Sequence, residues 1–165
     1  MPELLKPKIH IKTVYQLDTD LLKKNNIKGI IIDIDNTLVA WDARDLDEKT
    51  KAFIKDLRKK GFNIGILSNS TKKRVARLNK DLRLPAVCNA CKPWKYSYKK
   101  AMKIMNIYAS NTAVIGDQIF TDILGGNILG LYTILVDPIS SKEFFWTRLM
   151  RMAEALVLKR NNFSK

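Results

Sequence analysis

The stretch Gly-Ile-Ile-Ile-Asp-Ile-Asp-Asn-Thr at residues 29–37 decides the fold of this chain. Three consecutive isoleucines precede the first aspartate, and a strand that is apolar on both faces is typical of a parallel sheet covered by helices. A strand is therefore predicted over Gly29–Ile34. Because side chains alternate along an extended chain, Asp33 and Asp35 are expected on the same side of it.

Outward from this stretch, short apolar runs alternate with longer amphipathic segments. Further strands are predicted over Phe62–Leu67, Pro85–Cys88, Asn111–Ile115 and Tyr132–Val136. Helices are predicted over Asp47–Lys60, Thr71–Leu82, Trp94–Met105, Phe120–Leu129 and Ser141–Lys159. This alternation predicts one Rossmann-like α/β domain over residues 1–165, in which helices flank a mostly parallel sheet. Residues 1–28 and the amphipathic helix at about 141–159 are expected to be extensions of that domain.

Composition limits the class of protein. A chain of 165 residues suits a single domain, and its 46% hydrophobic content excludes intrinsic disorder. No apolar run approaches the roughly 18 residues of a membrane span, and basic residues interrupt the N-terminal segment, so we expect a cytoplasmic protein that is not secreted. The net charge of +14 favours anionic partners such as phosphorylated substrates, anionic membrane surfaces or nucleic acid.

The two cysteines, Cys88 and Cys91, form no disulfide framework. Their spacing matches half of a zinc site, but there is no second pair and His10 is the sole histidine. A Cys₄ or Cys₂His₂ site therefore cannot be completed within the chain. The role of the two thiols stays open.

Polar clusters follow four of the predicted strands. They are Asp33–Leu38, Ser68–Ser70, Cys91–Pro93 and Gly116–Asp122. In open α/β sheets, ligands bind outside the carboxyl ends of the strands. Each cluster alone is a common turn, but their coincidence at successive strand ends predicts an active site.

This set of side chains suits phosphoryl transfer. A carboxylate such as Asp33 can act as a nucleophile and form a covalent aspartyl-phosphate. The attack brings an anion towards a polyanion, so Mg²⁺ is expected, held by Asp33, Asp117 and the backbone carbonyl of Asp35. Asp35 is also the expected general acid and base, which protonates the leaving oxygen and then activates water.

The remaining predicted site residues are expected to neutralise negative charge, to bind the phosphoryl group or to support the metal. Lys92 would offset the negative charge of nucleophile and phosphate, while Ser68 and Asn69 would hold phosphoryl oxygens together with Lys92. Asp122 is expected to support the metal through water or to hold Lys92, with Asp117 in direct contact with the metal.

These residues resemble the motifs of the haloacid dehalogenase (HAD) superfamily. The D-x-D-x-T motif matches Asp33, Asp35 and Thr37, and the Ser, Lys and G-D-x₄-D motifs match Ser68, Lys92 and Gly116–Asp122. The runs at 32–42 and 114–127 resemble the YqeG-type subgroup, which is similar to phosphatidylglycerophosphate phosphatases. The resemblance implies a HAD-like phosphatase fold, and the second aspartate of the first motif goes with phosphatases and mutases.

Spacing predicts that the domain has no cap. Only residues 36–46 separate Asp35 from the next predicted helix, and one helix and one short strand fill the interval from Ser68 to Lys92. Lid domains confer selectivity for small molecules. An open site therefore suits a large or membrane-held substrate, or a cap supplied by another subunit.

Three functional hypotheses follow. The leading one is a Mg²⁺-dependent phosphomonoesterase acting on phosphatidylglycerophosphate, with peripheral contact between its basic surface and an anionic membrane. The second is a phosphatase for a soluble ester, such as a nucleotide or sugar phosphate. The third, from another class, is an RNA-binding or ribosome-assembly factor with a secondary HAD site, although no RNA-binding motif is evident. The sequence leaves the oligomeric state open, and also whether the C-terminal helix packs on the domain, forms a dimer seam or lies on a membrane.

Overall fold

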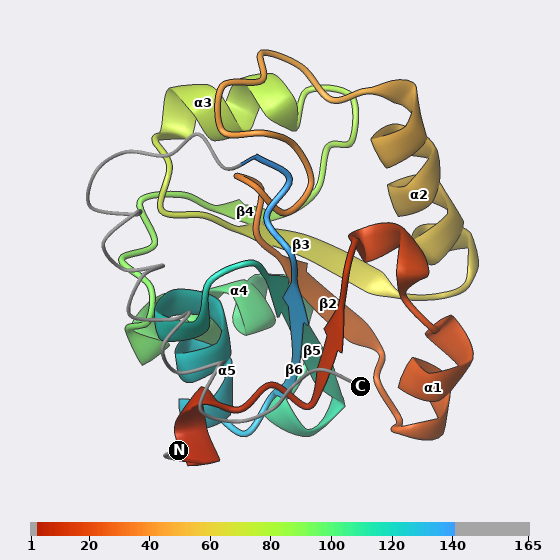
Figure 1. Cartoon of the computed structure of the whole chain (residues 1–165), viewed down its shortest axis with the longest axis vertical. Coiled ribbons are helices and arrows are strands. Elements are labelled where there is room, and N and C mark those ends of the chain that lie inside the picture. The colour runs from red at the N-terminus through yellow and green to blue at the C-terminus, as the bar shows by residue number, and fades with distance from the viewer. Residues whose placement is uncertain (1–2, 141–165) are drawn as a thin grey trace.

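The core of the protein is a parallel six-stranded sheet, as the computed structural model shows for residues 3–140. The strand order is β1-β6-β5-β2-β3-β4, and every pairing is parallel (Figure 1). The strands are β1 (Ile9–Ile11), β2 (Gly29–Ile32), β3 (Asn63–Leu67), β4 (Ala86–Val87), β5 (Thr112–Gly116) and β6 (Tyr132–Val136). The predicted α/β class is confirmed.

Helices cover both faces of the sheet (Figure 1). They are α1 (Thr19–Lys24), α2 (Glu48–Lys59), α3 (Lys72–Leu78), α4 (Lys95–Met105) and α5 (Leu124–Ile128). Ile30 and Ile32 of β2 join the core under α1, α2 and α3, whereas Ile31 joins the core under α4. The run of isoleucines is therefore buried on both faces, as a central parallel strand requires.

Local signals determine the two ends of α2, which lies within the predicted helix over Asp47–Lys60. Asp47 caps the helix, since its carboxylate accepts a hydrogen bond from the backbone N–H of Thr50 at 2.7 Å. Gly61 follows the helix with φ of +92°, a conformation that glycine adopts without a steric penalty. Ile54 and Leu57 form the buried stripe of α2.

The N-terminal segment contributes more to the fold than the sequence indicated. β1 adds an edge strand beside β6, and α1 packs Leu22 into the core.

Two helices differ from the ranges predicted for them. α3 ends at Leu78 because the side chain of Asn79 bonds the backbone of Leu84 and closes a turn there.

The predicted helix over Phe120–Leu129 is divided. It begins as a π-helical turn over Ile119–Ile123 and continues as α5. The predicted helix over Ser141–Lys159 lies outside the described residues.

The connections place the polar clusters at one edge of the sheet. Because all strands are parallel, their carboxyl ends meet there, and α3 and α4 both begin at that edge. Between residues 3 and 140, no cap domain interrupts the sheet, and no helix is long and apolar enough to cross a bilayer.

Candidate active site

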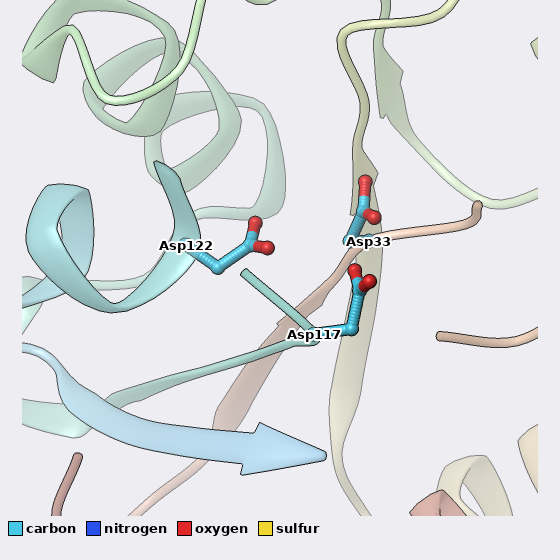
Figure 2. Close-up of side chains that lie close together, drawn as sticks. All are labelled: Asp33, Asp117 and Asp122. Carbon is cyan, nitrogen blue, oxygen red and sulfur yellow. The ribbon is translucent and has the colours of Figure 1, made fainter. Parts of the chain in front are cut away.

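Three buried carboxylates converge at the carboxyl edge of the sheet (Figure 2). Asp33 follows β2 and Asp117 follows β5, and these adjacent strands are in register, with Ile32 opposite Ile115. Asp122 comes from the π-helical turn. One carboxylate oxygen from each residue lies within 4.8 Å of the other two.

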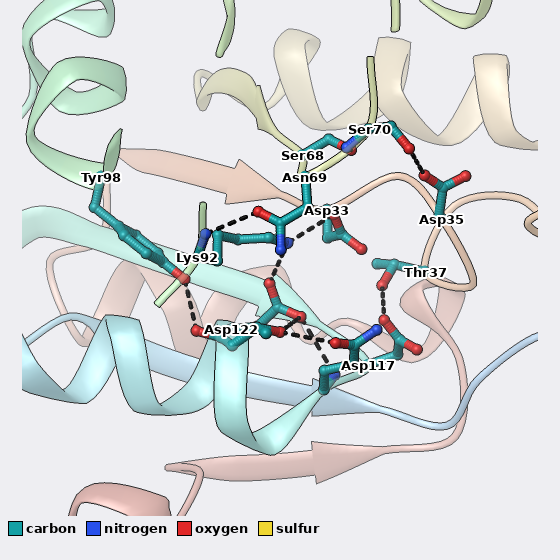
Figure 3. A network of polar contacts seen from close by, with 12 residues as sticks. Asp33, Asp35, Thr37, Ser68, Asn69, Ser70, Lys92, Tyr98, Asp117 and Asp122 are labelled. Atoms are coloured by element: carbon teal, nitrogen blue, oxygen red, sulfur yellow. Dashed lines mark hydrogen bonds and ion pairs between the residues drawn. The ribbon is translucent and has the colours of Figure 1, made fainter. Parts of the chain in front are cut away.

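Lys92 is the cation of this cluster. Its Nζ donates hydrogen bonds to Asp33 Oδ1 at 2.7 Å and to Asp122 Oδ1 at 2.6 Å (Figure 3). The lysine is buried, and a buried ammonium group is tolerated only where it is paired and hydrogen-bonded. These two contacts therefore fix both the position and the charged state of Lys92.

The electrostatics of the cluster leave negative charge to be balanced. Burial raises the pKa of Asp33 well above its usual value, Lys92 lowers it, and the neighbouring Asp122 and Asp117 raise it further. Burial also lowers the pKa of Lys92, but the carboxylates of Asp122 and Asp33 outweigh burial and hold that pKa above its ordinary value. One ammonium group thus faces three carboxylates, an arrangement that a divalent cation would stabilise.

The donor set fits a hard divalent cation, because carboxylate oxygens are the ligands such cations prefer. Contacts with its own turn hold the Asp122 carboxylate in place. Its second oxygen, Oδ2, accepts from the backbone N–H of Gln118 at 3.3 Å and from the Thr121 hydroxyl at 3.4 Å. The Thr37 hydroxyl donates to Asp117 Oδ1 at 3.2 Å and so links the 36–46 loop to the cluster.

Ser68 and Asn69 lie next to the cluster at the end of β3 (Figure 3). Ser68 is buried, and its hydroxyl accepts a hydrogen bond from the Ser70 backbone N–H at 3.1 Å. The Asn69 side-chain oxygen accepts from the Lys92 backbone N–H at 2.8 Å. Asn69 therefore positions the lysine-bearing loop, a contact that the sequence did not indicate.

The Asp35 side chain is not brought into the carboxylate cluster. Its Oδ1 accepts hydrogen bonds from Arg74 Nε at 2.8 Å and Arg74 Nη2 at 2.6 Å, and its Oδ2 is bonded by the Ser70 hydroxyl. Arg74 Nη1 also donates to the Ala43 carbonyl at 2.9 Å. Arg74 therefore ties Asp35 and the 36–46 loop to α3.

Sequence reasoning missed Arg74 and Tyr98. Arg74 belongs to a helix rich in Lys and Arg, so its residue type did not distinguish it from surface residues of that helix. Tyr98 has the helical spacing of a core residue, but its hydroxyl donates to the Thr121 carbonyl at 2.9 Å and supports the turn that holds Asp122. Burial raises the pKa of Tyr98, and the charge of Asp122 raises it further, so the hydroxyl stays a donor.

Gly116 allows Asp122 to approach β5. A Cβ atom at position 116 would lie 2.1 Å from Asp122 Cγ, so no other residue fits without displacing that carboxylate. Gly116 is therefore needed for the close packing of the Asp122 carboxylate, and not only for the turn at Gly116-Asp117.

A cavity of about 550 Å³ lies beside the site rather than in it. The N-terminal segment, the 36–46 loop and the residues after β6 line it, and Thr37 is the site residue that it shares.

Comparison with known proteins agrees with this architecture. A family model described as mitochondrial PGP phosphatase matches residues 1–140. The chain is 36% identical over 152 residues to the probable phosphatase YqeG of Bacillus subtilis, covering 92% of this chain and 88% of that protein. It is also 28% identical over 170 residues to phosphatidylglycerophosphate phosphatase 1, chloroplastic/mitochondrial, of Arabidopsis thaliana, which covers 93% of this chain but only 47% of that protein.

Solved structures share the fold at low identity. The cobalt-bound deoxy-D-mannose-octulosonate 8-phosphate phosphatase of Haemophilus influenzae superposes with a TM-score of 0.57 at 16% identity, covering 87% of this chain and 96% of that one. A HAD phosphatase from Thermococcus onnurineus superposes with a TM-score of 0.58 at 13% identity, covering 72% and 90%. These structures show that the chain has the fold of HAD phosphatases. The matches in sequence show that it is a phosphoric monoester hydrolase and belongs to the mitochondrial PGP phosphatase family.

Proposed function

We propose that the chain is a Mg²⁺-dependent phosphatase that works through an aspartyl-phosphate on Asp33. The observation that carries this proposal is the contact of Asp33 Oδ1 with Lys92 Nζ at 2.7 Å, beside Asp117 and Asp122. A carboxylate held in place next to a cation and a cation-binding cluster can attack phosphorus without strong charge repulsion. Asp33, Asp117 and the backbone carbonyl of Asp35 would hold Mg²⁺, with Asp122 supporting through Lys92.

The reaction has two displacements. In the first, an Asp33 carboxylate oxygen bonds to phosphorus while the ester P–O bond breaks, and protonated Asp35 gives its proton to the leaving oxygen. In the second, Asp35 takes a proton from water as the water oxygen attacks the phosphorus. The bond from phosphorus to Asp33 then breaks, which releases inorganic phosphate and restores the carboxylate.

The other residues stabilise charge during these steps. Mg²⁺, when bound, supplies electrostatic stabilisation of the phosphoryl oxygens. Lys92 would offset the negative charge of the phosphoryl oxygens with its ammonium group, and Ser68 and Asn69 would hold the phosphoryl group at the end of β3. Asp35 has to leave Arg74 to reach the ester oxygen, so its rotation is part of the catalytic cycle.

Phosphatidylglycerophosphate is the proposed substrate. The family model and the Arabidopsis relative both carry that lipid in their names. The site has no cap among residues 3–140, and the net charge is +14, so a substrate held in an anionic membrane can reach it. We propose that the chain acts as a peripheral protein at such a surface.

The direct test is phosphate release from phosphatidylglycerophosphate in mixed micelles, beside soluble nucleotide and sugar phosphates. Selective turnover of the lipid supports the proposal. Turnover of soluble esters alone would assign a soluble substrate, and no release from any ester, combined with salt-sensitive RNA binding, would favour the binding-factor hypothesis.

Removal of divalent metal tests the cofactor. We expect chelation by EDTA to lower turnover by at least about a hundredfold, because phosphoryl oxygens and carboxylates then repel without a cation between them. Added Mg²⁺ should restore the rate, and Asp117→Asn should raise the Mg²⁺ concentration that half-restores it. Asp56→Asn, which changes an exposed carboxylate on α2, is the matched control. Full activity in EDTA after exhaustive dialysis would contradict the proposal.

A further inference from the structure

Two large aromatic side chains stand exposed at the active-site edge. Trp94 is 73% exposed and Tyr96 is 74% exposed, and they follow Lys92 by two and four residues. Trp94 precedes α4 and makes no side-chain capping bond, so its side chain is not needed to begin that helix. Exposed apolar side chains that gather beside a functional site and are rimmed by polar residues mark a candidate interaction surface.

Positive charge surrounds this aromatic pair. Between Asp56 and Asp117, the sole acidic residue is Asp81, and it is paired with Lys51 at 2.8 Å. The same interval carries 14 lysines and arginines. Exposed lysines lie at the starts of α3 and α4, which both begin at the carboxyl edge; they are Lys72, Lys73, Lys95 and Lys99.

We propose that Trp94, Tyr96 and these four lysines form a docking surface for an anionic lipid bilayer. Aromatic rings with a polar edge favour the interface between headgroups and acyl chains, and lysines are attracted to anionic headgroups. Docking there turns the carboxyl edge of the sheet, and with it Asp33, towards the membrane. The inference deepens the proposed function and rests on it for the identity of the lipid substrate.

The position of this surface favours a bilayer over nucleic acid as the partner. Trp94 and the start of α4 closely follow Lys92, whose ammonium group contacts the carboxylates of Asp33 and Asp122. A bilayer docked there therefore presents a lipid phosphate directly to the site.

Vesicle flotation tests the surface. The probes are vesicles of phosphatidylcholine alone and of phosphatidylcholine mixed with phosphatidylglycerol, with the full chain at low and high salt. We expect binding to the mixed vesicles that weakens with salt, and a loss of affinity of about tenfold or more in the Trp94→Ala/Tyr96→Ser double variant. Trp94→Phe should retain most of the binding.

Tyr108→Ala is the matched control. Tyr108 is 70% exposed but precedes β5, at the opposite edge of the sheet. We expect this variant to bind mixed vesicles as the unmodified chain does. Circular dichroism and thermal unfolding of each variant separate loss of docking from loss of fold.

Activity separates failure of the docking surface from failure of the proposed function. In the double variant, the ratio of turnover on vesicle-borne phosphatidylglycerophosphate to turnover on a soluble ester should fall about tenfold. Equal flotation of double variant and unmodified chain would overturn the docking surface, even if the lipid is a substrate. Flotation that depends on Trp94 and Tyr96, without turnover of the lipid, would support the surface and refute the substrate. Binding to RNA in place of vesicles would also overturn the inference.

Discussion

Replacement of Asp33 by asparagine should abolish phosphate release from every ester, by at least about a thousandfold. An amide is a poor nucleophile, so the phosphoenzyme cannot form, whichever substrate binds. The amide oxygen can still accept a hydrogen bond from the Lys92 ammonium group, which contacts Asp33 at 2.7 Å, so the substitution removes the nucleophile and keeps the contact. The measurement is steady-state phosphate release, together with acid-quenched trapping of the phosphorylated protein from a radiolabelled ester.

A variant can also lose activity because it unfolds, but the structure predicts that Asp33→Asn stays folded. Asp33 is buried among carboxylates that raise its pKa, so its removal relieves repulsion, and Lys92 keeps its contact with Asp122 at 2.6 Å. The thermal unfolding temperature of metal-free Asp33→Asn should therefore not fall below that of the unmodified chain. Asp56→Asn should leave both phosphate release and trapping intact. A trapped phosphoenzyme in Asp33→Asn would assign the nucleophile to another residue.

The positions of the site residues could be predicted because topology determines them. Parallel strands bring their carboxyl ends to one edge, so polar residues after apolar runs had to meet there. Asp33, Asp117 and Asp122 do so within 4.8 Å, and Lys92 reaches two of them. Strand ends need only be located to within a residue or two for this argument to hold.

Side-chain orientation and short elements could not be predicted in the same way. Alternation placed Asp35 on the same side as Asp33, yet its carboxylate turns to Arg74, which lies 39 residues away in sequence. Rotamers depend on tertiary partners that no local pattern identifies. β1 spans only three residues, with His10 exposed between Ile9 and Ile11, so its pattern is too short to stand out from a turn.

Replacement of Asp35 by asparagine is the second prediction, with an expected loss of about a hundredfold to ten-thousandfold on alkyl phosphates. An alkoxide is a poor leaving group without a proton, and an amide cannot supply one. With p-nitrophenyl phosphate the leaving group needs no proton, so formation of the phosphoenzyme should slow far less. Hydrolysis of that intermediate still lacks its base, and the phosphoenzyme should therefore accumulate in Asp35→Asn and give a burst of nitrophenolate.

This dependence on the leaving group distinguishes a proton-transfer role from a structural one. Damage to the site would slow both esters alike and leave no accumulated phosphoenzyme. Asp45→Asn is the control, because Asp45 lies in the 36–46 loop that follows Asp35 but pairs with Lys80 at 2.7 Å, outside the carboxylate cluster. Equal slowing of phosphoenzyme formation from both esters, with no burst of nitrophenolate, would remove Asp35 from the role of acid and base.

The ion pair between Asp35 and Arg74 allows a second test of the role of Asp35, by combining substitutions at both positions. Arg74 donates twice to Asp35 Oδ1, at 2.8 and 2.6 Å, and also holds the Ala43 carbonyl at 2.9 Å. Residues in direct contact have effects that do not add, so Arg74→Gln should change kcat on an alkyl phosphate much less in Asp35→Asn than in the unmodified chain. If the two effects add, Arg74 acts on the 36–46 loop alone, and the orientation of Asp35 in the resting enzyme has no bearing on its rotation towards the substrate.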